Sequence, residues 1–207
     1  MAVEFWAEMV TGKSFEKLMD LSKKYKLVVI GGWAAYLLTK LHKSKDIDII
    51  VDYDTLFKMK REYALVKNER LKKYEIKSGE FDIDIYLPSY SKLMLPIKRI
   101  LSNTKSVNGI HVPKSEALVI LKQGAEIDRR NSLKGKKDLI DILALLIHSG
   151  FDITKYRDLI KEEGLMFLAK ELVNEIMAFD SRDLKYIGLN VKEFSDWKKK
   201  FIFTFKK

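Results

Sequence analysis

Two pairs of aspartates are the residues of this chain whose types and spacing best suit chemistry. Asp46 and Asp48 form the first pair, Asp82 and Asp84 the second, and each has the alternating form Asp-x-Asp. Side chains two residues apart on a β-strand project from the same face, with Cα atoms roughly 6–7 Å apart. Carboxylates at this spacing can converge on one or two divalent cations. Because aspartate is disfavoured in strands, its repetition in this form favours a site over an ordinary solvated strand face.

The other metal-binding residue types narrow the choice of metal. The chain has no cysteine, and its three histidines, His42, His111 and His148, are scattered along it. A thiolate zinc site is therefore excluded, and a histidine-rich one is disfavoured. Carboxylate oxygens remain, and these suit Mg²⁺ or Mn²⁺. The sequence therefore predicts a Mg²⁺ or Mn²⁺ site built from aspartates.

The segment before the first aspartate pair predicts a phosphate-binding turn. An apolar strand at 27–30 leads into Gly31 and Gly32, and a helix-forming stretch at 33–42 precedes the strand at 46–50. Backbone N–H groups at a helix N-terminus can hold phosphate oxygens, and glycines leave them unhindered by Cβ atoms. Phosphoryl and nucleotidyl transfer need such a cradle beside a metal-binding carboxylate pair, so the pattern indicates a transferase of this kind.

This order of strand, glycine pair, helix and Asp-x-Asp strand resembles the polymerase-beta-like nucleotidyltransferase superfamily, in which a later strand adds a third carboxylate. The resemblance implies that Asp46 and Asp48 hold two Mg²⁺ ions that bridge the triphosphate of a nucleoside triphosphate. It implies that Asp84, which apolar residues follow directly, shares one metal and eases deprotonation of the acceptor hydroxyl. Asp82 stays the alternative for this third carboxylate.

The same resemblance assigns the triphosphate to Gly31, Gly32 and Ser44. Two positions depart from the family's pattern. Trp33 stands where many members have serine or threonine, and His42 stands where an arginine is frequent. Phosphate contacts at the turn are therefore expected from backbone N–H groups alone.

The second half of the chain narrows the resemblance. The segment from Ser115 to Ala125 is similar to the helix "spE-x-L-x-x-x-K-x-x-A" of AbiEii-like nucleotidyltransferases, the toxin half of type IV toxin–antitoxin pairs. The segment 134–142 is similar to their block "R-x-K-x-x-D-h-x-D-h". The resemblance implies that Lys122 neutralises phosphate charge, that the acceptor is RNA such as a tRNA end, and that an antitoxin protein is a partner.

Some residues of this half keep a second interpretation. Lys122 is either a phosphate ligand or a lysine whose ammonium reaches solvent from the helix edge. Asp138 and Asp141 lie at i and i+3 of an apolar helix. They either support the site through Lys122 or Lys136, or act as a helix cap and a solvent-facing residue.

The net charge of +10 favours a polyanionic partner, either nucleic acid or a triphosphate. A basic patch, expected to be a loop, is either an RNA contact or a solvated run of charge; it comprises Arg129, Arg130, Lys134, Lys136 and Lys137.

Two other functions stay open. One is a nucleotidyltransferase with a protein or small-molecule acceptor. The other is a non-catalytic relative that binds nucleotide or nucleic acid, which the presence of all three carboxylates disfavours.

The family resemblance implies an α+β fold: a nucleotidyltransferase core with a mixed sheet flanked by helices, followed by a C-terminal helical region. The division is expected at 1–112 and 113–207. Periodicity predicts a first helix at 14–25 with Ser14 as N-cap and an Asn-Gly hairpin at 107–112. Further helices are predicted at 115–126, 138–148, 152–179 (two, divided near Gly164) and 191–204.

The chain has 207 residues, of which 47% are hydrophobic and 33% charged, as in soluble globular proteins. Its apolar stretches are shorter than the roughly 20 residues that span a bilayer. Its first residues lack the basic region of a secretory signal. We therefore expect a cytoplasmic protein without membrane contact.

Overall fold

A five-stranded mixed sheet holds the aspartates. The computed structural model describes residues 8–205 and orders the strands β1-β2-β5-β4-β3. Strands β2 and β5 run parallel, and the other neighbouring pairs are antiparallel. The strands are β1 (Val28–Ile30), β2 (Ile47–Ile50), β3 (Val66–Asn68), β4 (Lys73–Lys77) and β5 (Asp82–Tyr86). The predicted strand, helix and Asp-x-Asp strand order is confirmed, although the glycines open the helix itself.

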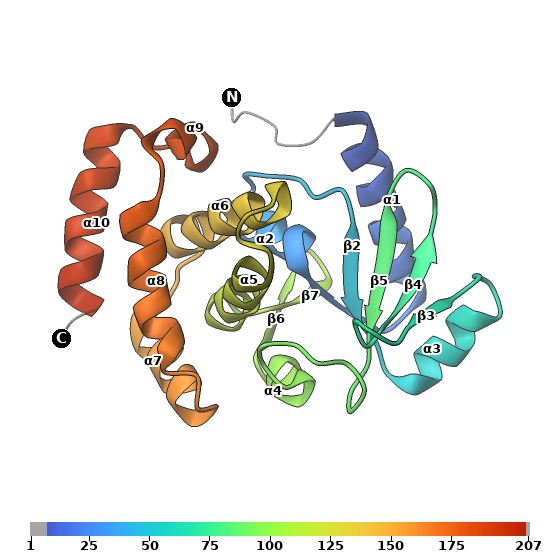
Figure 1. Cartoon of the computed structure of the whole chain (residues 1–207). Helices are drawn as coiled ribbons and strands as arrows, with labels where there is room; N and C mark the ends of the chain where they lie inside the picture. The colour runs from blue at the N-terminus through green and yellow to red at the C-terminus, as the bar shows by residue number, and fades with distance from the viewer. Residues whose placement is uncertain (1–7, 206–207) are drawn as a thin grey trace.

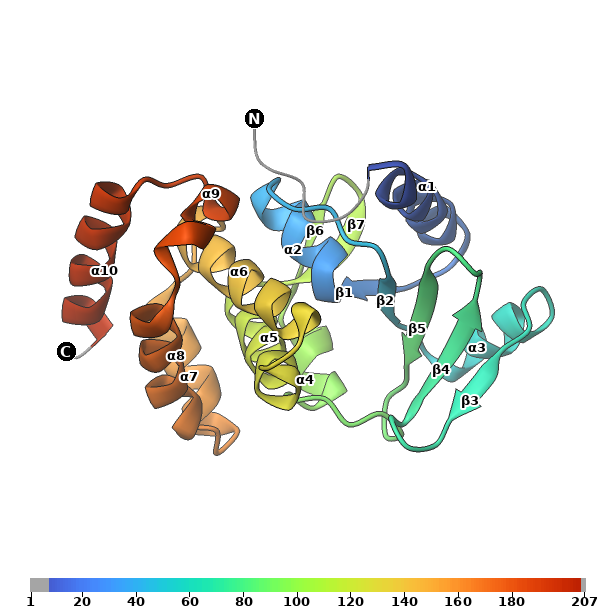
Figure 2. The same ribbon diagram turned by 45° about the horizontal axis from the view of Figure 1, so that its top comes forward.

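Helices flank this sheet and continue beyond it, which confirms the α+β class with a helical C-terminal region (Figure 1). The helices are α1 (Glu8–Lys24), α2 (Gly31–Thr39), α3 (Tyr53–Lys60), α4 (Ile97–Ser102), α5 (Ser115–Arg129), α6 (Leu133–His148), α7 (Ile153–Glu162), α8 (Phe167–Ala178), α9 (Leu184–Ile187) and α10 (Val191–Phe205), with a 3-10 turn at Ser181–Asp183. Both views place α5 and α6 in the middle of the molecule, between the sheet and the outer helices α7, α8 and α10 (Figures 1 and 2). Within residues 8–205, no helix combines the length and the apolarity needed to cross a membrane.

A separate hairpin joins the two halves of the chain. It consists of β6 (Thr104–Val107) and β7 (Ile110–Pro113), and β7 packs against β1. Its turn residues Asn108 and Gly109 have φ of 51° and 82°, the positive values that the tightest hairpin turns require. The hairpin predicted from the Asn-Gly pair is thus confirmed.

The first helix begins earlier than predicted. It starts at Glu8, so Ser14 lies inside α1 and is not its N-cap. The Ser14 hydroxyl instead accepts a hydrogen bond of 2.9 Å from the indole N–H of Trp33, and both side chains are fully buried. A buried indole needs such a partner, which explains why a serine faces the core at this position.

Helix α6 also begins earlier than the predicted residue 138. Ser132 caps it by accepting a 3.0 Å hydrogen bond from the backbone N–H of Gly135. Only three residues therefore separate α5 from α6, and most of the basic segment expected as a loop is helical. At the start of α5 the cap is Lys114, while Ser115 donates a 3.1 Å hydrogen bond to the carbonyl of Ser149.

Candidate active site

The two Asp-x-Asp strands lie side by side, so their aspartates share one face of the sheet. Asp48 on β2 is the register partner of Asp84 on the parallel strand β5. The alternate residues, represented by Ile49 and Ile83, are at most 1% exposed on the other face. This burial fixes the register, because a slip of one residue would turn isoleucines into the cleft and carboxylates into the core.

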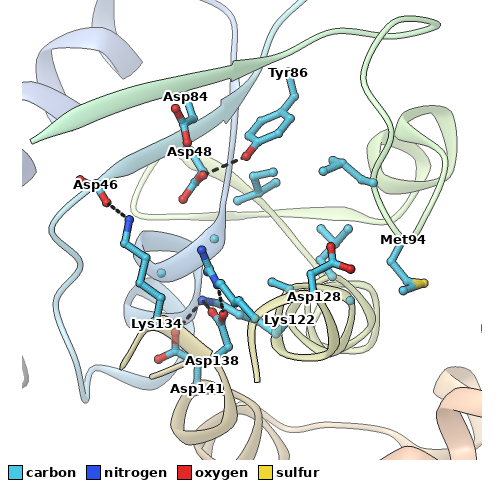
Figure 3. A pocket seen from close by; sticks show the side chains of 18 of the residues that line it. Asp46, Asp48, Asp84, Tyr86, Met94, Lys122, Asp128, Lys134, Asp138 and Asp141 are labelled. Carbon is cyan, nitrogen blue, oxygen red and sulfur yellow. Dashed lines mark hydrogen bonds and ion pairs between the residues drawn. The ribbon is translucent and has the colours of Figure 1, made fainter. Parts of the chain in front are cut away.

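A cleft of about 900 Å³ between the sheet and helices α5 and α6 is lined on the side of the sheet by three aspartates. They are Asp46, Asp48 and Asp84 (Figure 3). Asp46, just before β2, accepts a hydrogen bond of 3.3 Å from the backbone N–H of Asp82. The Asp82 side chain is not part of the cleft lining and forms an ion pair of 2.8 Å with Lys77.

Two of these carboxylates, those of Asp48 and Asp84, have raised pKa values. The enclosing protein and the neighbouring carboxylate of Asp84 raise the pKa of Asp48 to about 6. Burial also raises the pKa of Asp84, although an ion pair of 2.5 Å with Lys73 opposes this shift. The second oxygen of Asp84, Oδ1, is buried and has no hydrogen-bond partner among residues 8–205. Such a pair favours a ligand that brings positive charge.

A divalent cation fits the chemistry of this donor set, since three carboxylates offer the hard oxygen ligands of Mg²⁺. The unpartnered Asp84 oxygen and the like charge on Asp48 support that fit. As their side chains lie, however, no three His, Cys, Asp or Glu residues of the described part are gathered around one point. Two of the carboxylates form ion pairs with lysines. Asp84 pairs with Lys73, and Asp46 pairs with Lys134 at 2.9 Å.

The glycine pair brings the start of α2 directly against the aspartates. Gly31 has φ of +66°, and a Cβ atom there would lie 2.2 Å from the Oδ2 atom of Asp48. A Cβ atom on Gly32 would lie 2.5 Å from the hydroxyl of Ser44. That hydroxyl donates a 3.0 Å hydrogen bond to the carbonyl of Asp46. Only glycines allow this approach, so the helix N-terminus, Ser44 and the aspartates border one space.

A network of buried ion pairs forms the opposite wall of the cleft. Lys122 of α5 contacts Asp138 at 2.9 Å and Asp141 at 2.7 Å, and Lys137 contacts Asp141 at 2.5 Å. Each of these residues is at most 5% exposed. Burial lowers the pKa of Lys122, but the two aspartates more than offset it, so that pKa lies above its usual value. Burial lowers the pKa of Lys137.

These contacts decide between several interpretations of the sequence. Lys122 does not reach solvent, so the interpretation as a lysine at the helix edge is wrong. Asp138 and Asp141 are buried in α6 and are neither cap nor solvent-facing. They contact Lys122, whereas Lys136 forms its ion pair with Asp183 at 2.8 Å. A phosphate contact by Lys122 stays a prediction.

The cations of the basic patch lie mostly on helices α5 and α6, and they are not free in solvent. Each of its five cations forms an ion pair: Arg129 with Asp138 (2.7 Å), Arg130 with Glu126 and Glu171 (both 2.8 Å), Lys134 with Asp46 (2.9 Å), Lys136 with Asp183 (2.8 Å) and Lys137 with Asp141 (2.5 Å). Carboxylates of the protein itself therefore neutralise much of this charge.

Sequence reasoning missed other groups of the cleft. The hydroxyl of Tyr86 lies 3.3 Å from the Oδ1 atom of Asp48, and burial raises the pKa of Tyr86 well above its usual value. Its position two residues after Asp84 could have indicated this, since the two share a strand face. Lys73 reaches Asp84 across the pairing of the consecutive strands β4 and β5, which the sequence analysis did not predict.

Three further cations also line the cleft: Lys45, Arg70 and Lys92. Unlike the patch on α5 and α6, none of the three has an ion-pair partner among residues 8–205. Both Arg70 and Lys92 are exposed. They leave uncompensated positive charge at the border of the cleft.

Comparison with known proteins gives no family assignment. No protein-family model matches the chain, and no curated protein matches it. Among solved structures it is similar to JHP933 from Helicobacter pylori, with 16% identity, 97% of each chain covered and a TM-score of 0.44. It is also similar to an antigenic nucleotidyltransferase-like protein from Paracoccidioides brasiliensis, with 16% identity, 67% of this chain and 76% of that chain covered, and a TM-score of 0.38. At these scores, arguments about function depend on the site.

Proposed function

We propose that this protein is a Mg²⁺-dependent nucleotidyltransferase, which moves a nucleoside monophosphate from a nucleoside triphosphate to an acceptor hydroxyl. One observation carries the proposal. The carboxylates of Asp48 and Asp84 lie in register on parallel strands, directly beside the Gly31 end of helix α2. A metal-binding pair next to a helix N-terminus combines the two requirements of nucleotidyl transfer, cation binding and phosphate binding.

Each part of the site has a distinct proposed role. Asp46, Asp48 and Asp84 hold Mg²⁺, which supplies positive charge against the triphosphate when bound. The backbone N–H groups of Gly31 and Gly32 and the hydroxyl of Ser44 bind phosphate oxygens. This requires the Ser44 hydroxyl to turn away from the carbonyl of Asp46, to which it now donates.

The chain's own residues also provide for the acceptor. The oxygen of the acceptor hydroxyl attacks the α-phosphorus, and pyrophosphate leaves. Asp84 receives the hydroxyl proton at Oδ1, the oxygen that lacks a hydrogen-bond partner among the described residues. Burial raises the pKa of Asp84, which makes it a stronger base than an ordinary aspartate. Lys122 places positive charge on the opposite wall, where it favours the triphosphate.

For the acceptor we propose RNA such as a tRNA end, as in the AbiEii-like toxins that the sequence resembles, with an antitoxin protein as partner. The net charge of +10 and the uncompensated cations Lys45, Arg70 and Lys92 support this choice. A protein or small-molecule acceptor is the second candidate. It is favoured by the ion pairs that occupy all five cations of the basic patch from Arg129 to Lys137.

The test is a labelling experiment. The protein is incubated with Mg²⁺, total RNA and each of the four nucleoside triphosphates labelled at the α-phosphate, and the products are separated by size and by nuclease and protease treatment. The proposal expects label in RNA for wild type and none for Asp48→Asn. Label that survives nuclease and is lost to protease would select a protein acceptor. No transfer from any nucleotide to any acceptor would leave only a binding role.

A further inference from the structure

An apolar groove lies between two helices at the end of the molecule far from the sheet. Both views show helices α8 and α10 side by side at this end (Figures 1 and 2). The groove has a volume of about 590 Å³, and six residues line it: Val173, Met177, Lys198, Lys199, Ile202 and Phe203. None of them lines the cleft of the candidate active site, so the groove needs an explanation of its own.

Helix α8 has one apolar stripe more than its packing in the core uses. The buried stripe consists of Leu168, Leu172 and Ile176, which are all fully buried. Val173 and Met177 have the same spacing of four residues, one position further along, so they form a second stripe turned by about 100°. This second stripe lines the groove, and Met177 is 57% exposed there. A methionine side chain is flexible and polarizable, which suits a surface that receives apolar side chains.

Helix α10 contributes two lysines to the groove. Lys198 and Ile202 are four residues apart, as are Lys199 and Phe203, so each lysine lies one turn from an apolar side chain. The ammonium of Lys198 lies 5.4 Å from the centre of the Phe194 ring. In the described part of the chain neither lysine has an ion-pair partner, and no carboxylate lines the groove. The groove therefore combines an apolar floor with positive charge that no carboxylate of the described chain offsets.

We infer that this groove docks an amphipathic helix of a partner protein, one whose apolar stripe is flanked by aspartates or glutamates. A groove between two helices fits the convex surface of a third helix, and apolar anchors at i, i+3, i+4 and i+7 fill such grooves. Acidic residues beside that stripe would pair with Lys198 and Lys199, because complementary charge fixes orientation and speeds encounter. The inference is independent of the proposed nucleotidyl transfer.

Three other occupants fit the groove less well. A symmetric dimer would set the same patch of two copies against itself and bring the lysines of both copies together. A lipid surface takes up a protruding apolar face, whereas these side chains line a groove. Single-stranded RNA stacks its bases on aromatic rings, whereas Val173, Met177 and Ile202 make up most of the apolar lining.

The test uses three synthetic helical peptides of roughly 18 residues, or five turns, titrated into the full chain and followed by fluorescence anisotropy. The first peptide carries leucines at i, i+3, i+4 and i+7, with glutamates on both sides of this stripe. The second has the same composition with its leucines scattered around the helix, and the third has lysine in place of every glutamate. We expect the first peptide to bind at least about tenfold more tightly than either of the others.

One pair of variants tests the apolar floor. Met177→Asp puts a carboxylate on the floor and should weaken binding of the glutamate peptide by about tenfold or more. Met9→Asp is the matched control, because Met9 is an exposed methionine on helix α1 outside the groove lining. It should bind the peptide as wild type does, and thermal unfolding checks that both variants are folded.

A second pair of variants tests the charge. Lys198→Glu/Lys199→Glu should reverse the preference, so that the lysine peptide binds more tightly than the glutamate peptide. Lys58→Glu/Lys60→Glu changes the net charge by the same amount at two exposed lysines of helix α3. It should retain the wild-type preference.

Equal affinity for the three peptides, no binding tighter than about 1 mM, or unchanged affinity in Met177→Asp would overturn the inference. Sedimentation, flotation with phosphatidylserine vesicles and filter binding of a tRNA pool test the other occupants. Dimerisation, vesicle binding or RNA binding that is lost in Met177→Asp and kept in Met9→Asp would assign the groove to that occupant and overturn the inference as well.

Discussion

Two groups of charged side chains face each other across the cleft, and they are paired very differently. On the helix wall, Lys122 and Lys137 each contact a carboxylate within 2.9 Å, and Asp141 contacts both lysines. On the sheet, Asp48 has no cationic partner within ion-pair distance among the described residues, and its pKa rises to about 6. The carboxylates of the wall are paired with lysines, whereas Asp48 has no such partner among residues 8–205 and is repelled by the neighbouring carboxylate of Asp84.

This difference in pairing indicates which charged residues stabilise the fold and which are available to a ligand. Breaking a buried ion pair leaves an uncompensated charge, so the wall contributes to stability and to the shape of the cleft. Like charges held together cost stability and persist where a ligand relieves them. We therefore propose that Asp48 and Asp84 bind the ligand and that Asp138 and Asp141 support the wall of the cleft.

The largest expected effect concerns the sheet. Asp48→Asn and Asp84→Asn should each lower nucleotidyl transfer by about three orders of magnitude, since metal ligation contributes several kcal/mol to transition-state stabilisation. Asp82→Asn is the control, because its carboxylate pairs with Lys77 outside the cleft, and it should retain most activity. Initial rates with labelled nucleotide measure this. An inactive Asp82→Asn beside an active Asp84→Asn would reverse the assignment of the third carboxylate.

The next largest effect is on the free energy of unfolding and concerns the ion pairs of the helix wall. Asp141→Asn leaves the buried ammonium of Lys137 without its 2.5 Å partner and should lower the free energy of unfolding by about 3–5 kcal/mol. Asp48→Asn, which relieves like charge, should not lower it in the presence of a chelator. Urea unfolding of both variants measures the contrast. Equal destabilisation by the two would remove the distinction between the two sides of the cleft.

Glu175, a buried carboxylate outside the cleft lining, tests whether a raised pKa by itself indicates a functional residue. Burial and the nearby Glu126 raise the pKa of Glu175 to about 8, against 4.5 for an ordinary glutamate. Because the folded-state pKa exceeds the unfolded one, the native state binds more protons between these values. Stability should therefore fall as pH rises from about 4.5 to about 8, by up to about 1.4 kcal/mol per pH unit.

Glu175→Gln should remove this dependence and leave nucleotide affinity unchanged. Urea unfolding of wild type and variant at several pH values measures it. If stability of the two proteins changes with pH in parallel, Glu175 is not the titrating group. If nucleotide affinity also falls, the helical part is coupled to the cleft.

The smallest effect concerns RNA. Arg70 and Lys92 are exposed and without ion pairs among residues 8–205, unlike the cations of α5 and α6. Each contact to a single-stranded phosphate contributes about 0.7 to the slope of log affinity against log salt. Arg70→Ala/Lys92→Ala should therefore flatten that slope for a tRNA pool more than Arg129→Ala/Arg130→Ala. Filter binding over a salt series decides, and the reverse order would restore the basic patch as the RNA contact.

What the sequence could predict of this site followed local spacing. Alternation put Asp46 and Asp48 on one strand face, and the glycine pair marked the start of a helix, because both signals lie within a few residues. The pairing of β2 with β5, which puts Asp48 beside Asp84, needed the family resemblance, since no local pattern encodes it. The domain division at 112 and the roles of the site residues stay predictions.

What could not be predicted came from contacts between different helices and strands. Lys134 reaches Asp46, and Lys73 reaches Asp84, through tertiary packing and strand pairing. The run of charged residues before 138 gives no apolar periodicity, so the sequence predicts a loop where α6 begins. The structure shows that these charges have carboxylate partners. A run of cations in a sequence does not tell how many are neutralised in the fold.

The most direct test of the central claim is the metal dependence of nucleotide binding. Each of the four α,β-methylene nucleoside triphosphates, which cannot be turned over, is titrated by calorimetry into wild type and into Asp48→Asn, with Mg²⁺ and then with chelator. Binding of at least one analogue to wild type should be strong in Mg²⁺ and lost in chelator, and Asp48→Asn should bind weakly in both. Equal affinity of wild type with Mg²⁺ and with chelator would contradict a metal site on these carboxylates.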